Sequence, residues 1–291
     1  MSRRPTPRAA LAPALSLLAC LLAAGCGGVE AGDGGANDAG ADAHSPAPSR
    51  SASASESASA PSSSDPASPT PTPSSTPTDA SGAFSPFANA DGTERGLAPL
   101  TSAADHERAR GLIATLRTKG RGPRTGYERE AFGYAWKDSV DDVPLAHNGC
   151  DTRNDLMARD GRQLKRKQGS GCVIVSMTLL DPYTGNTIDW RKQQATEVQI
   201  DHVMPLSYDW QMGAARWSES ERERIANDPL NLIPVDGPTN SSKGDSGPAS
   251  WLPPNKQIRC AYSVRFAQVA LKYKLPVTSP DKQTMLEQCR A

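Results

Sequence analysis

The tryptophans and tyrosines of this chain are confined to one part of the sequence. All five Trp and all six Tyr follow residue 92. Between Ser45 and Gly82, 33 of 38 residues are Ser, Pro, Ala or Thr, and none is aromatic. A segment of this composition buries too little apolar surface to offset the entropy that it loses on ordering. The ordered core must therefore come from residues 92–291, a length typical of one domain.

Charge divides the chain in the same way. Residues 1–25 carry three Arg and no acid, residues 27–92 carry one Arg and eight acids, and residues 93–291 carry 28 bases and 24 acids. The net charges are therefore +3, −7 and +4, and they sum to the zero of the whole chain. A single ordered domain behind a polar segment excludes a large multidomain protein and a polytopic membrane protein.

The first 25 residues have the pattern of an export signal. Three arginines precede an apolar run from Ala9 to Ala24, which is too short for a membrane span but typical of a secretory signal. The run ends L-A-A-G-C at Cys26, which resembles the lipobox of bacterial lipoproteins, where cleavage leaves a lipidated cysteine. An ordinary signal peptide is the alternative. We expect a signal peptide (1–25), a tether (26–91) and a domain (92–291), located at the extracellular face of a bacterial cell membrane or secreted.

The cysteines agree with export. Four remain beyond Cys26, at positions 150, 172, 260 and 289. An even number in an oxidising compartment indicates two disulfides, and neighbour pairing, Cys150–Cys172 and Cys260–Cys289, is the simplest of three connectivities. Bridges of this loop size each stabilise a fold by roughly 3 kcal/mol. A structural zinc site is the alternative, but the sequence has no C-x-x-C and the domain has only three His.

Hydrophobic periodicity and turn residues predict an α+β domain whose C-terminal part is helical. Residues 121–151 are expected to form loops with short strands, and residues 153–168 to be helical at first and then basic. Helices are expected over 103–119, 214–226, 258–273 and 282–290, and strands over 172–180, 187–191, 198–204 and 230–235.

The most informative block runs from Ile200 to Asp245. It opens I-D-H-V-M-P-L-S, continues N-D-P-L-N-L-I-P-V-D-G and ends P-T-N-S-S-K-G-D. It thus contains a strand ending in Asp-His, a strand opening with Asn-Leu, and an Asn-x-x-Lys at a helix start. This three-part pattern resembles the HNH endonucleases, also called His-Me finger or ββα-metal endonucleases, with a helix inserted between the two strands.

Three flanking sequence motifs narrow the resemblance to one branch of the family. They are N-G-C-D-T-R-N-D-L from Asn148, L-D-P-Y-T-G from Leu180 and W-L-P-P-N from Trp251. Together they look like secreted HNH proteins related to the C-terminal nuclease domain of GmrSD-type restriction enzymes, over roughly Tyr127 to Cys289. The resemblance implies an α+β fold with a ββα-metal (His-Me finger) core, an inserted helix and flanking helices.

The same resemblance implies roles for five residues of a metal-dependent endonuclease. His202 would be the general base, because an imidazole is largely neutral near pH 7. Asp201 and Asn240 would offer oxygens to one divalent cation, Mg²⁺ or Mn²⁺. Lys243 would contact a phosphate, and Asn231 would hydrogen-bond backbone and hold the loop that carries the base.

The Asp-His pair raises a geometric difficulty. Adjacent residues of a regular strand face opposite sides, so Asp201 and His202 cannot aim at one point from an ideal strand. A bent or terminal strand position would remove the difficulty. Pro205 lies just downstream, but it does not establish a bend.

A basic run is the candidate nucleic-acid contact. Its five bases would track a phosphate backbone, and a solvated charged loop is the alternative. The five are Arg159, Arg162, Lys165, Arg166 and Lys167.

Two other functions compete with the endonuclease. A catalytically silent HNH-like module would only bind nucleic acid or wall polymer, but the motif residues are all intact. Gly244-Asp-Ser-Gly-Pro248 resembles the nucleophile segment of trypsin-like proteases, yet that chemistry needs an upstream His and Asp in a double β-barrel. The sequence therefore favours hydrolysis of nucleic acid, with DNA as the expected substrate. The lipid anchor is the expected membrane contact, and no protein partner is expected.

Overall fold

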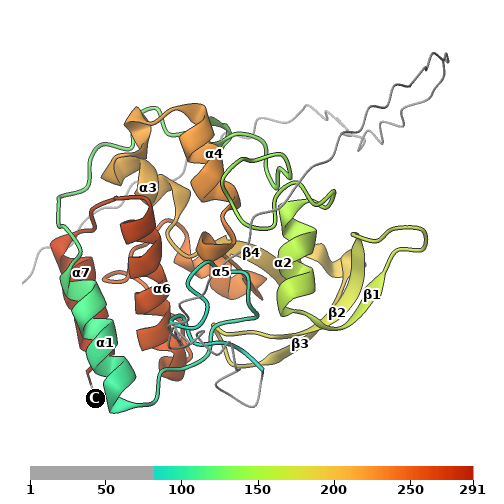
Figure 1. The fold of residues 1–291 in the computed structure, drawn as a ribbon, viewed down its shortest axis with the longest axis horizontal. Coiled ribbons are helices and arrows are strands. Elements are labelled where there is room, and N and C mark those ends of the chain that lie inside the picture. The colour runs from blue at the N-terminus through green and yellow to red at the C-terminus, as the bar shows by residue number, and fades with distance from the viewer. Residues whose placement is uncertain (1–81, 291) are drawn as a thin grey trace, which may run out of the picture. The chain divides into compact units, whose positions relative to one another are not determined.

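The computed structural model describes residues 82–290, which form an α+β domain with two antiparallel sheets, and most of its helices lie at the end opposite the larger sheet (Figure 1). The helices are α1 (Ala103–Ala114), α2 (Thr152–Asp160), α3 (Leu206–Met212), α4 (Glu219–Asn227), α5 (Gly237–Lys243), α6 (Arg259–Lys272) and α7 (Ser279–Gln288). The strands are β1 (Arg162–Arg166), β2 (Ile174–Leu180), β3 (Thr187–Arg191), β4 (Val198–His202) and β5 (Leu232–Asp236).

Polar caps set where the helices begin. The Ser102 hydroxyl accepts from the Asp105 amide at the start of α1, as the sequence predicts. Ser218 and Glu221 form a reciprocal capping box on α4, which therefore starts five residues later than expected. Thr278 caps α7 through the Asp281 amide. Each cap satisfies backbone N–H groups that the first helical turn leaves without partners.

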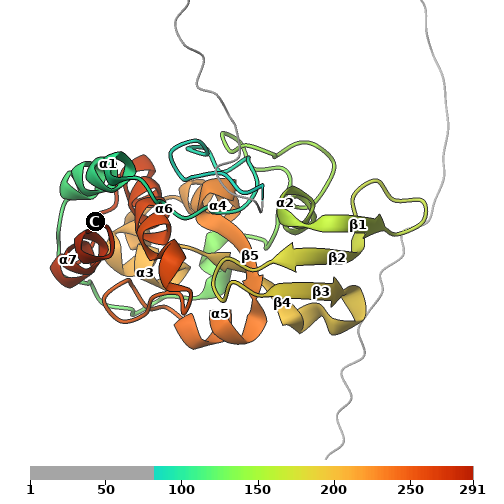
Figure 2. The same ribbon diagram turned by 90° about the horizontal axis from the view of Figure 1, so that it is seen from below.

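The larger sheet has the order β1-β2-β3 (Figure 2). The predicted strand at 187–191 is confirmed as β3, and it pairs with β2 across a turn that Asp181 holds through the amides of Tyr183 and Thr184. The basic run instead contains an edge strand, β1, whose register against β2 is irregular. Its residues alternate too weakly in hydrophobicity for a strand to be recognised from the sequence. In residues 121–151 the structure has a 3₁₀ turn at Arg129–Phe132 and no strand.

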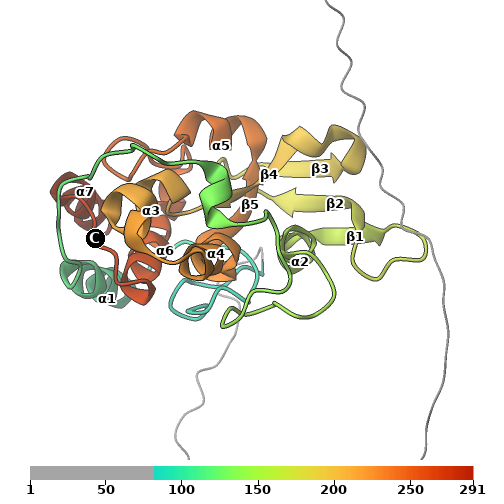
Figure 3. The ribbon, with the colours of Figure 1, turned by 90° about the horizontal axis from the view of Figure 1, so that it is seen from above.

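The smaller sheet pairs β4 with β5, and α5 follows at once and packs against both strands (Figure 3). Two helices, α3 and α4, lie between the strands in sequence, where one was expected. The order β4, inserted helices, β5, α5 is the ββα arrangement that the resemblance implies.

The β4–β5 ribbon separates two hydrophobic clusters. Ile233 and Val235 belong to the main cluster, which α1, α3, α4, α6 and α7 surround. Ile200 and Leu232 belong to a second cluster beneath α2 and the three-stranded sheet. The helical and sheet-rich parts lie on either side of the ribbon in Figures 1 and 2.

The domain begins earlier than the expected boundary at Gly92. Phe84 is buried, its amide donates to the Arg95 carbonyl, and its carbonyl accepts from the Ala98 amide. The Asn89 carbonyl accepts from the buried Arg265 guanidinium. Composition placed residues 82–91 in the tether because every Trp and Tyr follows residue 92, but these residues pack against the core. The signal peptide, Cys26 and the Ser-rich tract lie outside the described residues.

Within residues 82–290, none of the helices has the length and apolar character needed to cross a membrane.

Candidate active site

An open pocket of about 420 Å³ lies at the end of β4. Three of the five motif residues, Asp201, His202 and Asn240, border it. Arg124 and Arg129, from the loop region before α2, border it as well. The structure thus brings strand, helix and loop residues to one cavity.

β4 is regular up to its last residue. Asp201 pairs with Ile233 and His202 with Leu232, without a bulge. Because side chains of a strand alternate, Asp201 lies on the face of the main cluster and His202 on the face of the second cluster. Of the two expected solutions, a bent or a terminal strand position, the structure has the terminal one: His202 is the last residue of β4, and the two side chains point into different surroundings.

His202 is held by one ring nitrogen. Its Nε2 lies 2.9 Å from the Ala226 carbonyl oxygen. A carbonyl only accepts, so Nε2 carries the hydrogen and Nδ1 has the free lone pair. Nδ1 has no hydrogen-bond partner among residues 82–290. The Trp136 indole lies nearly parallel to the imidazole, with ring centroids 6.2 Å apart and planes 16° apart.

The imidazole is neutral in this environment. Burial, and then the positive charge of Arg129, lower the pKa of His202 from 6.5 to about 3. The hydrogen bond to Ala226 opposes this shift, because it favours the protonated ring. A neutral ring with an open Nδ1 can accept a proton.

Asn231 acts on the backbone that follows His202. Its Oδ1 accepts from the Met204 amide at 2.8 Å, and its Nδ2 donates to the carbonyls of Met204 and Ile225. Its own carbonyl accepts from the Val203 amide. The fully buried side chain thus ties the segment after β4 to the end of α4.

Lys243 is buried, which contradicts the expected phosphate contact. Its Nζ lies 2.8 Å from both carboxylate oxygens of Asp201 and 2.7 Å from the His202 carbonyl oxygen. An ammonium has three donor hydrogens, and three acceptors already surround this one. The Asn-x-x-Lys spacing places both residues on one helix, but it does not say that the lysine faces the strand.

The Asp201 carboxylate is enclosed. Besides Lys243, the Tyr183 hydroxyl donates to it, and the side chain is 6% exposed. Burial raises the pKa of Asp201 and lowers that of Lys243, and their mutual attraction opposes both shifts. The two residues form a paired, hydrogen-bonded unit inside the main cluster.

This arrangement does not fit a divalent cation on Asp201. The lysine ammonium already occupies the carboxylate, whereas Asn240 donates only its Nδ2, to the Gln199 side chain at 2.9 Å, so the conflict lies at Asp201. Within the described residues, no group of three or more His, Cys, Asp or Glu could hold a metal. A cation shared by Asp201 and Asn240 would require Lys243 to leave the carboxylate.

Arg129 is the residue that the sequence analysis missed. It lies on the 3₁₀ turn, is half-buried, and has no ion-pair partner among residues 82–290. Burial lowers the pKa of Arg129, because water solvates its charge poorly there. Arg124 lies at the same pocket and pairs with Asp245 at 3.2 Å. Neither arginine belongs to a recognisable motif, so only the folded arrangement identifies them.

The basic run is divided by the structure. Arg159 is buried, pairs with Asp160 at 2.7 Å and donates to the carbonyls of Pro229 and Leu232, which contradicts a nucleic-acid contact. It joins α2 to the ribbon instead. Arg162 is partly buried beside a different cavity. The other three side chains are exposed on or just after β1, and their contact with nucleic acid stays a prediction; they are Lys165, Arg166 and Lys167.

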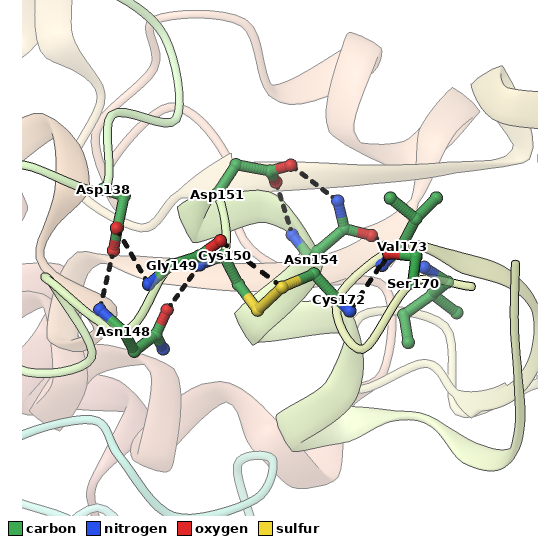
Figure 4. The surroundings of a disulfide bond; sticks show 10 residues. Asp138, Asn148, Gly149, Cys150, Asp151, Asn154, Ser170, Cys172 and Val173 are labelled. Atoms are coloured by element: carbon green, nitrogen blue, oxygen red, sulfur yellow. Dashed lines mark hydrogen bonds between the residues drawn. A yellow bond between two sulfur atoms is a disulfide. The ribbon is translucent and has the colours of Figure 1, made fainter. Parts of the chain in front are cut away.

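The two neighbour disulfides are present. Cys150–Cys172 joins the segment before α2 to the segment before β2, beside amides that Asp138 holds (Figure 4). Cys260–Cys289 joins α6 to the end of α7 inside the main cluster. The protease-like segment follows α5, and its Asp245 contacts Arg124 and Ser207. The domain that contains it is α+β and has two small sheets within the described residues, so it is no double β-barrel.

Comparison with known proteins agrees with this geometry. Residues 151–288 match the family described as GmrSD restriction endonucleases, C-terminal domain. An "Uncharacterized secreted protein" of Arthroderma benhamiae is 38% identical over 186 residues, which cover 62% of this chain and 84% of the relative. No solved structure matches the chain. The ββα unit, the Asp-His pair and the family match together place this chain in the family of the GmrSD restriction endonuclease C-terminal domain, an HNH nuclease-type domain.

Proposed function

We propose that this domain is an endonuclease that hydrolyses phosphodiester bonds of nucleic acid, with DNA as the expected substrate and His202 as the general base. The observation that carries the proposal is the state of His202. Its Nε2 donates to a fixed carbonyl, its Nδ1 has no hydrogen-bond partner among residues 82–290, and the neutral residue borders a cavity that Arg129 also borders. Hydrolysis at phosphorus needs a proton acceptor and a positive charge near the phosphate.

The proposed proton transfer starts at Nδ1. A water between the imidazole and the phosphorus gives its proton to Nδ1 while its oxygen attacks phosphorus. The bond from phosphorus to one bridging oxygen breaks, and that oxygen leaves as an alcohol after taking up a proton from water. The Ala226 carbonyl then stabilises the imidazolium through Nε2. A bound phosphate raises the basicity of His202, because a nearby negative charge favours the charged ring.

The proposed charge neutralisation comes from the arginines. The Arg129 guanidinium has no competing carboxylate, and a guanidinium matches two phosphate oxygens in one plane. Arg124 is available once a phosphate competes with the exposed Asp245. Lys243 positions the base from behind, because it holds the His202 carbonyl while neutralising Asp201.

HNH nucleases typically use a divalent metal ion, whose chemistry would be to neutralise charge at phosphorus. Mg²⁺ or Mn²⁺ on Asp201 and Asn240 does not fit the arrangement described above. The steps assigned to His202 and Arg129 do not depend on it. A cation can bind Asp201 only if Lys243 leaves the carboxylate. Loss of activity on adding a chelator would therefore indicate that Lys243 moves during the reaction.

We also propose that the domain acts outside the cytoplasm. The two disulfides support this, because they persist in oxidising compartments, and the fungal relative is named a secreted protein. Anchoring through a lipid on Cys26 is the proposed attachment, and it rests on the sequence pattern alone.

One observation favours a second candidate, a silent module that binds nucleic acid without cutting it. The carboxylate of Asp201 is enclosed and is not open to a metal, as in an inactive site. Residues 82–291 incubated with supercoiled plasmid decide between the two. An endonuclease converts the plasmid to relaxed and then linear forms, and Arg129→Gln slows this about 10²-fold or more. Arg129→Lys is the charge-preserving control. Binding without any nicking, with or without added Mg²⁺, would support the silent module.

A further inference from the structure

A second pocket of about 360 Å³ lies beside the site, between the first turn of α2, the end of β3 and the loop before α2. Its lining includes two indoles, two cations and an amide: Trp136, Trp190, Arg153, Lys192 and Asn154. The proposed hydrolysis uses none of them. The volume falls in the usual range of small-ligand sites, about 300–1,000 Å³.

Trp136 connects the second pocket with His202. Its indole lines the second pocket and also lies parallel to the His202 ring. Trp136 is a bulky residue at φ 61°, a left-handed conformation that such residues rarely adopt. Its carbonyl accepts from the Thr152 amide of α2, and the adjacent Lys137 pairs with Glu223 of α4 at 2.9 Å. The indole is therefore held in place between two helices, next to the general base.

The free charges around the second pocket are positive. Arg153 is half-buried and makes one long contact, 3.4 Å, to the Val198 carbonyl. Lys192 is exposed and has no ion-pair partner among residues 82–290. Asp151 also borders the pocket, but its carboxylate is turned to α2, where it accepts from the Asn154 amide and side chain. The Trp190 indole N–H is buried without a hydrogen-bond partner in the described part of the chain.

We propose that the second pocket binds one unstacked base of the substrate strand, next to the phosphate that His202 attacks. This inference rests on the proposed function, and it names the substrate class as single-stranded or locally unpaired nucleic acid. An aromatic face accepts any of the four bases, and flanking cations hold the adjoining phosphates. A base inside a duplex is already stacked, so it must leave the helix to enter such a pocket.

This proposal explains why an aromatic ring lies between the second pocket and His202. A base stacked on the far side of Trp136 places its own phosphate toward His202 and Arg129. Arg153 and Lys192 then contact the strand on the other side of that base. Because stacking carries no hydrogen-bond code, the pocket selects for unpaired strand rather than for sequence.

The test measures binding rather than cleavage. In the His202→Gln background, an eight-nucleotide labelled DNA strand is titrated by fluorescence anisotropy, beside the same strand with a central abasic site and beside its duplex. Trp136→Ala is expected to weaken binding of the intact strand roughly 10-fold and to leave the abasic strand unaffected. Trp136→Phe should keep most of the affinity. Tyr134→Ala, an exposed aromatic of the same loop, is the matched control and should change nothing.

Lys192→Ala keeps the experiment decisive if Trp136→Ala fails to fold, because Lys192 is exposed. It should weaken both strands and lower the slope of log affinity against log salt by about one. Equal binding of intact and abasic strands, or a duplex bound as tightly as the single strand, would overturn the pocket. Discrimination between strands by His202→Gln, together with no nicking of plasmid or single strand by the parent domain, would instead overturn the proposed hydrolysis and leave the pocket standing.

Discussion

The two faces of the β4–β5 ribbon carry adjacent motif residues into opposite surroundings. On the face of the main cluster, Asp201 is enclosed by Lys243 and Tyr183, and no charged atom is left for a ligand. On the other face, His202 keeps one open nitrogen at a cavity with an unpaired Arg129. Both residues border one cavity, but their side chains face opposite sides of the ribbon and therefore differ in what they can bind. One face holds the ribbon in place, and the other is arranged for chemistry.

The enclosed face is also the one where a broken contact costs most. A buried ion pair gains from its hydrogen bonds about what its desolvation costs, but one partner left alone is strongly unfavourable. The open face has solvent nearby, so a substitution there changes reactivity more than stability.

Lys243→Met should unfold the domain most easily. It leaves the Asp201 carboxylate buried without its cation, at a cost of about 3–5 kcal/mol in the free energy of unfolding. The double variant Asp201→Asn/Lys243→Met removes both charges and should recover much of that loss. Urea unfolding followed by tryptophan fluorescence measures both. Lys167→Met, an exposed lysine, is the matched control and should stay within ~0.5 kcal/mol of the parent. A Lys243→Met loss no larger than the control's would remove the distinction between the faces.

The disulfides offer the next comparison. Each closes a loop of similar size, with sequence separations of 22 and 29, so each should contribute roughly 3 kcal/mol. Cys260 and Cys289 lie in the main cluster, and replacing them also disturbs packing. We expect Cys260→Ala/Cys289→Ala to lower the melting temperature more than Cys150→Ala/Cys172→Ala. Calorimetry of both variants checks the order, and the reverse order would contradict it.

Asp209 should show the smallest effect, and its sign depends on pH. Its carboxylate is fully buried and has no hydrogen-bond partner in the described part of the chain. Burial raises the pKa of Asp209 well above its usual value, although the charge of Lys243 opposes the shift. A raised folded pKa gives stability below the unfolded value of about 3.9, and that stability is lost as pH rises through the folded pKa.

Asp209→Asn cannot ionise, so it should melt higher than the parent at pH 8 and equally near pH 4. Thermal unfolding across that range measures the difference. A variant that melts lower at every pH would show that the carboxylate has a stabilising partner after all.

The sequence predicted the ββα unit well, because its strands and turns are marked locally. The expected strands at 198–204 and 230–235 are β4 and β5 to within two residues at either end, and outside this unit the strand at 187–191 and the final helices also follow from ordinary periodicity. The short α3 and the edge strand β1 were missed, since seven residues are too few to define a helical period and β1 has a single apolar residue. The domain start was placed too late for a related reason: Phe84 packs on the core through tertiary contacts that composition does not reveal.

The candidate site was predictable in part. The Asp-His pair and the two asparagines, Asn231 and Asn240, lie in recognisable sequence motifs. The inward direction of Lys243 depends on which side of α5 meets β4, and spacing alone leaves that open. Arg129 lies more than seventy residues before His202 in a loop without a motif. Strand alternation predicts that the side chains of Asp201 and His202 face opposite sides of β4, and the regular pairing of β4 with β5 agrees with this.

The central claim is that the open face performs the chemistry and the enclosed face supports it. The most direct test is the nicking rate of supercoiled plasmid by His202→Ala, measured at equal concentrations of folded protein. The account predicts a fall of roughly 10²–10⁴-fold, the usual range for loss of a general base. We also expect a change of under ~1 kcal/mol in the free energy of unfolding, since removal of a neutral ring leaves no unpaired charge behind. Nicking by His202→Ala at the rate of the parent would contradict the account.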